Sequence, residues 1–393
     1  MQYRRFGRTE LQMPVFSCGG MRYQYKWQDV PAADIPVDNQ ANLEATIRKA
    51  LALGINHIET ARGYGTSEMQ LGKILPHLPR QEMIIQTKIA PHATAAEFRQ
   101  DFNTSLGYLQ LDYVDLLGIH GINNRELLEQ TLHPGGCLDE AKRLQKEGKV
   151  KFIGFSTHAP LEVILEIIQT NQFDYINLHW YYINQGNWQA IAAATKLDMG
   201  VFIISPSNKG GMLYEPSPKL REICQPLSPL VFNDLFCLSQ SQVHTLSLGA
   251  AKPEDFDEHL RTLEYLDQAP QILAPIMTKW QEAAIDKLGE NWIKTWQVGL
   301  PKIEETPAGV NISMILWLRN LALAYDMWEY AKMRYNLLTN GGHWFPGGNA
   351  AQVKELDLRA CLSRSPHSDT IPQILAETHS LLAGATVKRL SQS

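Results

Sequence analysis

The sequence predicts an α/β fold, a (β/α)8 TIM barrel followed by a helical C-terminal extension. From Pro14 to about Gly249, short apolar runs alternate with helical patterns, which is typical of repeated βα units. The chain has 393 residues, about 140 more than one barrel of roughly 250 residues needs. We therefore expect a barrel over residues 1–268 and an extension over residues 269–393 that packs on it.

Eight apolar runs predict the strands of the barrel. They are residues 15–17, 56–59, 83–88, 113–120, 150–155, 175–177, 200–204 and 244–248. Helical patterns between them include residues 40–53, 95–109, 139–148 and 161–170. A further helix is expected after Gly63-Tyr64-Gly65, where Ser67 and Gln70 form a capping pair.

Composition and charge describe an ordinary globular protein. Hydrophobic residues make up 44% of the chain, charged residues 20%, and the formal net charge is -5, a balance that disfavours a nucleic-acid partner. The N-terminus lacks the apolar core of a signal peptide, so we expect a cytoplasmic protein. The apolar run at residues 312–325 contains Arg319 and Asn320, which predicts a packed helix and no membrane span. The five cysteines are scattered, which disfavours disulfides and zinc sites.

Four ionisable side chains lie at or just after the ends of predicted strands. Glu59, Lys88 and His120 each end a strand, and Tyr64 follows Glu59 by five positions. In a parallel barrel the carboxyl ends of all strands open on one face, where catalytic groups gather. We therefore expect these four side chains to form one site.

The chemistry of this set favours proton donation to a carbonyl oxygen. A free tyrosine has a pKa near ~10 and donates readily only if a nearby positive charge lowers that value, which Lys88 could do. Glu59 is the obvious partner for a buried lysine, and His120 is placed to hydrogen-bond a carbonyl oxygen. With no evident nucleophile or metal set, the reaction needs an external hydride donor, which suggests a nicotinamide cofactor.

The order of these motifs closely resembles the aldo-keto reductase superfamily over most of residues 1–260. The segments that carry the resemblance are residues 4–9, 59–68, Lys88, 117–124, 154–157, 205–211 and 249–254. The resemblance implies a barrel that binds an extended NADPH without a Rossmann glycine loop, and no Gly-x-Gly-x-x-Gly occurs here. It implies that Tyr64 is the general acid, Lys88 its activator, His120 the carbonyl-orienting group and Glu59 the partner of Lys88.

The resemblance also implies a set of cofactor-binding residues. Ser156 and Asn177 match the positions that hold the nicotinamide carboxamide. The loop at residues 205–209 matches the pyrophosphate region, and residues 249–259 match a clamp on the adenosine phosphate. The individual cofactor residues are Ser156, Asn177, Ser205, Ser207, Lys209, Gly249, Lys252, Glu258 and His259.

Two departures from the family pattern bear on activity and cofactor choice. Glu59 replaces the usual aspartate and adds one methylene, so the carboxylate must recede or the lysine must shift. In the clamp, Asp255 stands where arginine often meets the 2′-phosphate, and His259 where asparagine often meets adenine. A negative Asp255 facing a phosphate is repulsive unless it turns away, although Lys252 or Lys209 could supply positive charge.

The tail shows a second resemblance, to a family branch with a ferredoxin-like extension that carries Cys-x2-Cys-x2-Cys-x3-Cys-Pro runs. Counted back from two prolines of this tail, Pro307 and Pro366, the eight cysteine slots hold Trp296, Gly299, Lys302, Thr306, Glu355, Leu358, Cys361 and Ser365. One thiol in eight cannot assemble a cluster. We therefore expect a degenerate ferredoxin-like module with no iron–sulfur cluster and no metal.

These observations predict an NADP-dependent aldo-keto reductase, a cytoplasmic monomer that reduces small aldehydes or ketones. The alternative is a catalytically weak nicotinamide-binding interaction or sensor protein. The altered residue Glu59 and the loss of the cluster cysteines from the tail would be consistent with it. Four aromatic residues, Trp27, Trp180, Tyr181 and Tyr182, suggest an aromatic-lined substrate pocket, with core packing as the other interpretation.

Overall fold

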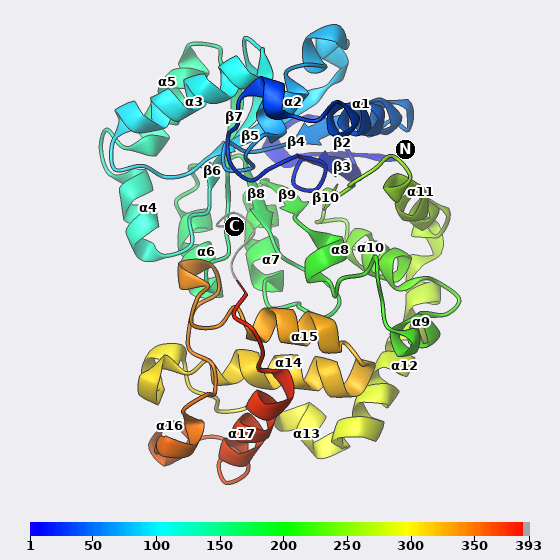
Figure 1. Cartoon of the computed structure of the whole chain (residues 1–393), viewed down its shortest axis with the longest axis vertical. Helices are drawn as coiled ribbons and strands as arrows, with labels where there is room; N and C mark the ends of the chain where they lie inside the picture. Colours follow the sequence, from blue (N-terminus) through cyan, green and yellow to red (C-terminus); the bar gives the residue numbers. More distant parts are fainter. Residues whose placement is uncertain (388–393) are drawn as a thin grey trace. The chain divides into compact units, whose positions relative to one another are not determined.

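The computed structural model describes residues 1–387, and its central feature is a closed barrel of eight parallel strands (Figure 1). Around the barrel the order is β10-β3-β4-β5-β6-β7-β8-β9. The strands are β3 (Phe16–Gly19), β4 (His57–Glu59), β5 (Ile84–Ile89), β6 (Val114–His120), β7 (Val150–Ser156), β8 (Tyr175–Leu178), β9 (Gly200–Ile203) and β10 (Thr245–Leu248). The predicted barrel is confirmed, and each predicted strand matches an observed one to within two residues at either end.

Helices surround the strands on the outside of the barrel. In chain order they are α1 (Val37–Ala52), α2 (Ser67–Leu71), α3 (Ala95–Leu109), α4 (Arg125–Leu132), α5 (Cys137–Lys146), α6 (Leu161–Gln169), α7 (Trp188–Lys196), α8 (Pro206–Lys209), α10 (Pro229–Leu238) and α11 (Asp255–Leu260). Helix α3 begins with a capping box, in which Thr94 accepts from the Glu97 backbone N–H and the Glu97 carboxylate accepts from the Thr94 backbone N–H.

The predicted capping pair of α2 was wrong. Thr66, and not Ser67, occupies the N-cap position, and its side chain makes no capping bond to the backbone. The Ser67 hydroxyl is instead 2.8 Å from the hydroxyl of Thr60, so it joins the helix to the end of β4. The Thr66 hydroxyl donates to Gln70 Oε1 at 2.9 Å and receives the backbone N–H groups of Tyr25 and Lys26. These longer-range contacts compete successfully with local capping.

An antiparallel hairpin of β1 (Tyr3–Arg5) and β2 (Gln12–Pro14), absent from the predicted elements, closes the amino-terminal end of the barrel. Phe6 in its turn packs on Tyr175, the first residue of β8, with ring centroids 5.7 Å apart. A Cβ on Gly200, the first residue of β9, would lie only 2.6 Å from the Phe6 ring. The hairpin therefore fills the space between the strand starts with buried apolar side chains.

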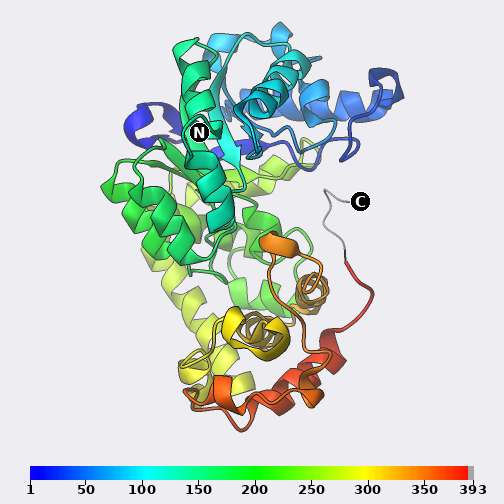
Figure 2. The same ribbon diagram turned by 90° about the vertical axis from the view of Figure 1, so that its left-hand side faces the viewer.

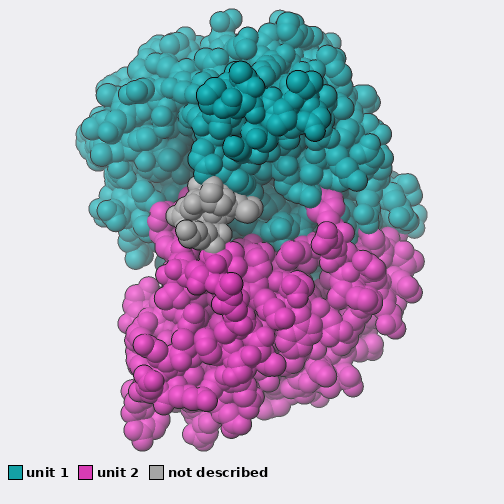
Figure 3. All heavy atoms as spheres, viewed as in Figure 1, with its two compact units in different colours: residues 1–210, 230–269 teal, residues 211–229, 270–393 magenta. Residues whose placement is uncertain are grey.

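The chain divides into two compact units (Figure 3). The first consists of residues 1–210 and 230–269 and holds the barrel. The second takes residues 211–229 together with the chain from residue 270 onward. Its helices, mostly yellow to red in Figure 2, are α9 (Pro218–Cys224), α12 (Ala269–Leu288), α13 (Glu290–Thr295), α14 (Ile312–Tyr325), α15 (Trp328–Tyr335), α16 (Arg359–Leu362) and α17 (Ile371–Leu382). The helical character predicted for the C-terminal part is thus confirmed.

Helix α14 is the packed helix predicted from residues 312–325. It contacts α15 and α17, and its interrupting Asn320 is buried and accepts a hydrogen bond of 2.9 Å from the Trp292 indole N–H. Its last residue, Tyr325, packs on Trp280 with ring centroids 4.3 Å apart. Over residues 1–387, no helix has the length and apolar character needed to cross a membrane.

The two tail segments that were aligned with the cysteine runs, before Pro307 and before Pro366, meet in the second unit. A Cβ on Gly299 would lie 2.0 Å from the backbone oxygen of Arg364, so the chain before Pro307 runs against the chain before Pro366. Cys361 donates its thiol hydrogen to the Leu358 carbonyl. Within residues 1–387, no three potential metal ligands of the His, Cys, Asp or Glu type come together. A ferredoxin-like origin of this unit stays a prediction.

Candidate active site

Glu59 and Lys88 form a buried ion pair at the carboxyl ends of β4 and β5. The Lys88 ammonium contacts Glu59 Oε1 and donates a 2.7 Å hydrogen bond to the carbonyl of Thr60. Only 1% of Lys88 and 2% of Glu59 is exposed, so both charges depend on these contacts. Burial lowers the pKa of Lys88, and the nearby Glu59 carboxylate partly opposes that shift. A lysine held in this way is a compact positive charge inside an apolar barrel.

Tyr64 lies directly against this pair. The Lys88 ammonium is 4.8 Å from the centroid of the Tyr64 ring, and the Tyr64 hydroxyl is 3.5 Å from Glu59 Oε1. The imidazole of His120, at the end of β6, meets the Tyr64 ring edge to face at 5.7 Å and 83°. Tyr64 and His120 are partly exposed, whereas the ion pair beneath them is buried. The structure therefore brings all four predicted residues together, with the two potential proton donors on the accessible side.

The loop that carries Tyr64 needs a glycine at position 65. Gly65 has a φ of +52°, in the left-handed region, and a Cβ there would lie 2.1 Å from the Lys26 carbonyl oxygen. The adjoining Trp27 ring meets Tyr64 edge to face at 6.1 Å. The segment around Trp27 therefore presses on the loop and holds the phenol in position.

The extra methylene of Glu59 is accommodated by two residues that the sequence analysis missed. The hydroxyl of Ser247 on β10 donates to Glu59 Oε2 at 3.1 Å. A Cβ on Gly19 would lie 2.5 Å from that hydroxyl and 3.2 Å from Glu59 Oε2, so the absent side chain leaves room for the longer acid. The available signal was a polar Ser247 between the two leucines of β10.

Asn177 is the strongest indication of a ligand beside these residues. It is completely buried at the end of β8, and among the residues that the structure describes neither its amide nitrogen nor its amide oxygen has a hydrogen-bond partner. An unsatisfied buried amide is costly, and its donor and acceptor complement those of another primary amide. Ser156, one strand away and paired with Asn177 in register, accepts the Gly121 backbone N–H at 3.0 Å. This pair fits a nicotinamide carboxamide.

The predicted adenosine clamp is only partly assembled. Gly249 and Glu258 are partly exposed and Lys252 is exposed. His259, by contrast, is completely buried and pairs with the equally buried carboxylate of Asp234. The structure therefore places His259 in the interior, behind the exposed residues of the clamp.

Asp255 does turn away from the solvent side of the clamp. Its carboxylate accepts the Ala251 backbone N–H at 2.8 Å and lies 3.5 Å from the guanidinium of Arg22. Arg22 also donates to the Gly249 carbonyl at 2.5 Å, which sets a positive charge beside the clamp. Arg22 was not among the predicted site residues.

Comparison with known proteins shows which proteins the barrel resembles. Residues 17–172 match the model of the Aldo/keto reductase family. This match covers less than half of the chain and lies within the barrel unit. The chain is 34% identical over 188 residues to the L-galactose dehydrogenase of Arabidopsis thaliana, an alignment that covers 44% of this chain and 57% of that protein. It is 26% identical over 176 residues to the NADH-specific methylglyoxal reductase of Escherichia coli (strain K12), covering 39% and 52%. The chain thus spans a little over half the length of these relatives.

Solved structures show the same fold at lower identity. An aldo-keto reductase from Bacillus halodurans in its holo form superposes with a TM-score of 0.57 at 19% identity, covering 69% of this chain and 96% of that one. A thermostable aldo-keto reductase in complex with the inhibitor epalrestat gives the same score and identity and is covered completely. These two structures therefore share the barrel fold of this chain.

Most of the predicted aromatic pocket belongs to the core of the barrel unit. Trp180 is 3% exposed and stacks on Phe236 at 4.7 Å, and Tyr181 is 1% exposed. Tyr182 packs edge to face on Phe232. Trp27, by contrast, packs edge to face on Tyr64. The pocket interpretation was therefore wrong for Trp180 and Tyr181, because the same apolar character fits the barrel wall.

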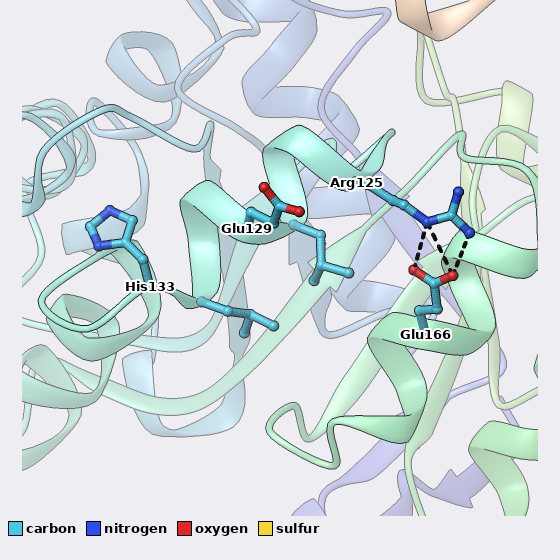
Figure 4. A pocket seen from close by; sticks show the side chains of 6 residues that line it. Arg125, Glu129, His133 and Glu166 are labelled. Atoms are coloured by element: carbon cyan, nitrogen blue, oxygen red, sulfur yellow. Dashed lines mark hydrogen bonds and ion pairs between the residues drawn. The ribbon is translucent and has the colours of Figure 1, made fainter.

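A hollow on the barrel unit lies elsewhere, between α4 and α6 (Figure 4). Arg125 and Glu166 face each other across it, joined by a hydrogen bond of 2.5 Å. Its other lining residues are Leu128, Glu129, Leu132 and His133. None of the predicted site residues lines this hollow, and its one arginine is neutralised, so it offers less chemistry than the strand ends.

Proposed function

We propose that this protein reduces aldehydes or ketones to alcohols with a nicotinamide cofactor, using Tyr64 as the general acid. The observation that carries the proposal is the buried Lys88–Glu59 pair lying directly against the Tyr64 ring. A lysine charge near a phenol stabilises the phenolate that remains after proton transfer, which lowers the barrier to donation. We further propose that the enzyme is a cytoplasmic monomer acting on small carbonyl compounds.

Asn177 and Ser156 would hold the cofactor by its carboxamide, since the buried amide of Asn177 needs a donor and an acceptor at that point. The nicotinamide, when bound there, would supply the hydride for the carbonyl carbon. His120 and Tyr64 together polarise the carbonyl oxygen, and Tyr64 transfers its proton to that oxygen. Lys88 stabilises the resulting phenolate while Glu59 keeps the buried lysine charge compensated.

We propose NADPH as the preferred cofactor. Asp255 is engaged by Arg22 and by the Ala251 backbone, so its charge is partly compensated and does not repel a 2′-phosphate as strongly as an isolated carboxylate. Arg22 and Lys252 would then provide the positive charge. Comparing Kd values for NADPH and NADH tests this choice, and a preference for NADH would contradict it.

Tyr64→Phe tests the function itself. Carbonyl reduction is expected to fall by about 10²-fold or more, because a general acid is lost, while the Kd of NADPH stays nearly unchanged. The measurement is the loss of reduced-nicotinamide absorbance with a panel of aldehydes and ketones. Tyr113→Phe is the matched control, since that tyrosine precedes β6 at the other end of the barrel. Equal turnover of Tyr64→Phe and parent would exclude Tyr64 as the acid, and NADPH binding without any turnover by the parent would favour a sensor.

A further inference from the structure

Three basic side chains outside the proposed catalytic set converge on the catalytic face of the barrel. His158 follows the end of β7 by two residues, His179 directly follows β8, and Lys209 ends α8, the short helix after β9. These strands are consecutive in the barrel. Because the carboxyl ends of parallel strands share one face, the three side chains lie on the same face as Tyr64 and His120.

Their nitrogen atoms are within hydrogen-bond distance of one another. Lys209 Nζ is 2.9 Å from His179 Nε2 and 3.4 Å from His158 Nδ1. The two imidazole nitrogens are 2.7 Å apart, and the ring centroids are separated by 4.4 Å. We name these three residues the basic cluster.

A chain of hydrogen bonds fixes the orientation of the cluster. The Tyr181 hydroxyl donates to the Ile204 carbonyl, so the adjacent His179 Nδ1 acts as the donor to Tyr181. Nε2 of a neutral His179 is then an acceptor, and it receives a hydrogen from the Lys209 ammonium. Lys209 is thereby directed toward β7 and β8, whereas the proposed adenosine clamp follows β10, on the other side of β9. Lys209 is therefore no longer counted among the cofactor-binding residues expected from the sequence.

The cluster stands close to the proposed reaction centre. The His158 backbone N–H donates to Asn123 Oδ1 at 2.7 Å, and Asn123 lies three residues after His120. Neighbouring strands are about 4.8 Å apart, so the strands that carry the cluster lie one to three such spacings, roughly 5–15 Å, from the strand of His120. A small molecule with its carbonyl at Tyr64 and His120 can reach the cluster with its other end.

We propose that Lys209 and His158, positioned by His179, bind an anionic group, a carboxylate or a phosphate, on the carbonyl substrate. An ammonium group and imidazole N–H donors are the groups that recognise such anions. Lys209 and His158 are half-buried and His179 is 8% exposed, so the Lys209 charge is less screened than on an open surface. This inference rests on the proposed function and assigns the substrate class, short aldehydes or ketones that carry one anionic group.

The test compares charged and uncharged substrates of matched length. The pairs are glyceraldehyde 3-phosphate with glyceraldehyde, and 4-oxobutanoate with butanal, which separate phosphate from carboxylate. The parent should prefer the charged member, and Lys209→Met should lower that preference in kcat/KM by about tenfold or more, with little change for the uncharged member. Lys209→Arg should keep most of the preference. Lys196→Met, an exposed lysine on α7, is the matched control.

Each outcome decides the question. An unchanged ratio of kcat/KM between the charged and the uncharged substrate in Lys209→Met would overturn the proposal. An equal loss of kcat/KM for both substrates, together with weaker NADPH binding, would also overturn it, because it would show that Lys209 binds the cofactor. If the parent reduces no carbonyl at all, the proposed function fails separately. The cluster is then tested by titrating inorganic phosphate and acetate while recording the ring NMR signals of His158 and His179. Shifts that are lost in Lys209→Met would support an anion site, and unmoved signals would refute it.

Discussion

The charge of the proposed adenosine clamp depends on one residue that lies far away in the chain. Asp255 alone would repel a 2′-phosphate, but Arg22, from the loop after β3, contacts both Asp255 and the Gly249 carbonyl. Arg22 and Gly249 are 227 positions apart, so no local pattern could have revealed the contact. The loop that follows the first barrel strand thus helps to compensate a carboxylate that follows the last.

Arg22→Met is expected to weaken NADPH binding more than NADH binding. It removes a positive charge and leaves Asp255 uncompensated, and a charge-assisted contact worth about 1.5–3 kcal/mol corresponds to tenfold or more in Kd. Fluorescence titration with both cofactors measures the ratio. Arg48→Met, an exposed arginine on α1, serves as the control. An equal loss for both cofactors would show that Arg22 does not act on the 2′-phosphate.

Lys88→Met separates the structural from the catalytic role of the buried pair. The substitution leaves the Glu59 carboxylate buried and unpaired, so the free energy of unfolding should fall by about 3–5 kcal/mol. The double variant Lys88→Met, Glu59→Leu should recover much of that stability because both charges are gone, yet it should still fail to reduce carbonyls. Urea unfolding and turnover are measured together. A double variant that regained activity would rule out Lys88 as the activator of Tyr64.

At the scale of elements, the strands were predictable and several connections were not. Each barrel strand is a local apolar run, so a few consecutive residues are enough to predict its position. The hairpin of β1 and β2 is different, because β1 is Tyr-Arg-Arg and has no apolar run, and because the anchor of the hairpin, Phe6, packs on Tyr175 from β8. The same distinction holds in the site. Glu59, Lys88 and His120 are strand ends, whereas Ser247 acquires its role only when β10 closes the barrel against β3.

Glu68 on α2 joins the proposed catalytic loop, the segment between β4 and α2 that carries Tyr64, to two other elements. Its completely buried carboxylate accepts hydrogen bonds from Thr87 on β5 at 2.5 Å and from Ser105 on α3 at 3.0 Å. The Arg62 guanidinium of the catalytic loop lies 3.7 Å away and is itself paired with Asp29. Burial raises the pKa of Glu68 from 4.5 to about 7, although these hydrogen bonds and Arg62 act in the opposite direction.

This shift predicts a pH-dependent stability. Between about pH 4.5 and 7 the folded protein keeps the Glu68 proton that the unfolded chain has lost, so the free energy of unfolding falls as the pH rises through this window. The loss is on the order of 3 kcal/mol. Glu68→Gln should remove this dependence, so its stability relative to the parent should rise between pH 5 and pH 8. Thermal or urea unfolding at both values measures it, and parallel curves for the two proteins would contradict the assignment.

At the scale of the whole molecule, the chain passes between its two units more than once. It leaves the first unit after Gly210, forms α9 within the second unit, returns at Leu230 and leaves again after Ala269. Within the second unit, Ser217 donates to the Tyr325 carbonyl at 3.0 Å, and Lys279 donates to the Gln225 carbonyl at 3.0 Å. The sequence predicted one boundary at residue 268 because residues 211–229 resemble an ordinary loop between a strand and a helix.

Truncation after residue 268 should therefore impair solubility. It removes the partners of α9 and exposes Leu220, Ile223 and Cys224, which are buried in the full chain. The soluble fraction after expression and the binding of a hydrophobic dye measure the effect. The variant Leu220→Ser, Ile223→Ser in the truncated chain is the control and should recover part of the solubility. A truncated chain as soluble as the full protein would show that α9 does not need those partners.

The closed amino-terminal end of the barrel has a consequence for the order in which ligands bind and leave. Phe6 and its hairpin close the barrel at the amino-terminal ends of the strands. The proposed catalytic and carboxamide-binding residues all lie at or just after the carboxyl-terminal ends. If the proposed function holds, cofactor and substrate enter through the same end of the barrel. The molecule that settles deeper, beside the buried Asn177, must arrive first and depart last. The barrel is then open at one end, and its geometry alone imposes an ordered binding of cofactor and substrate.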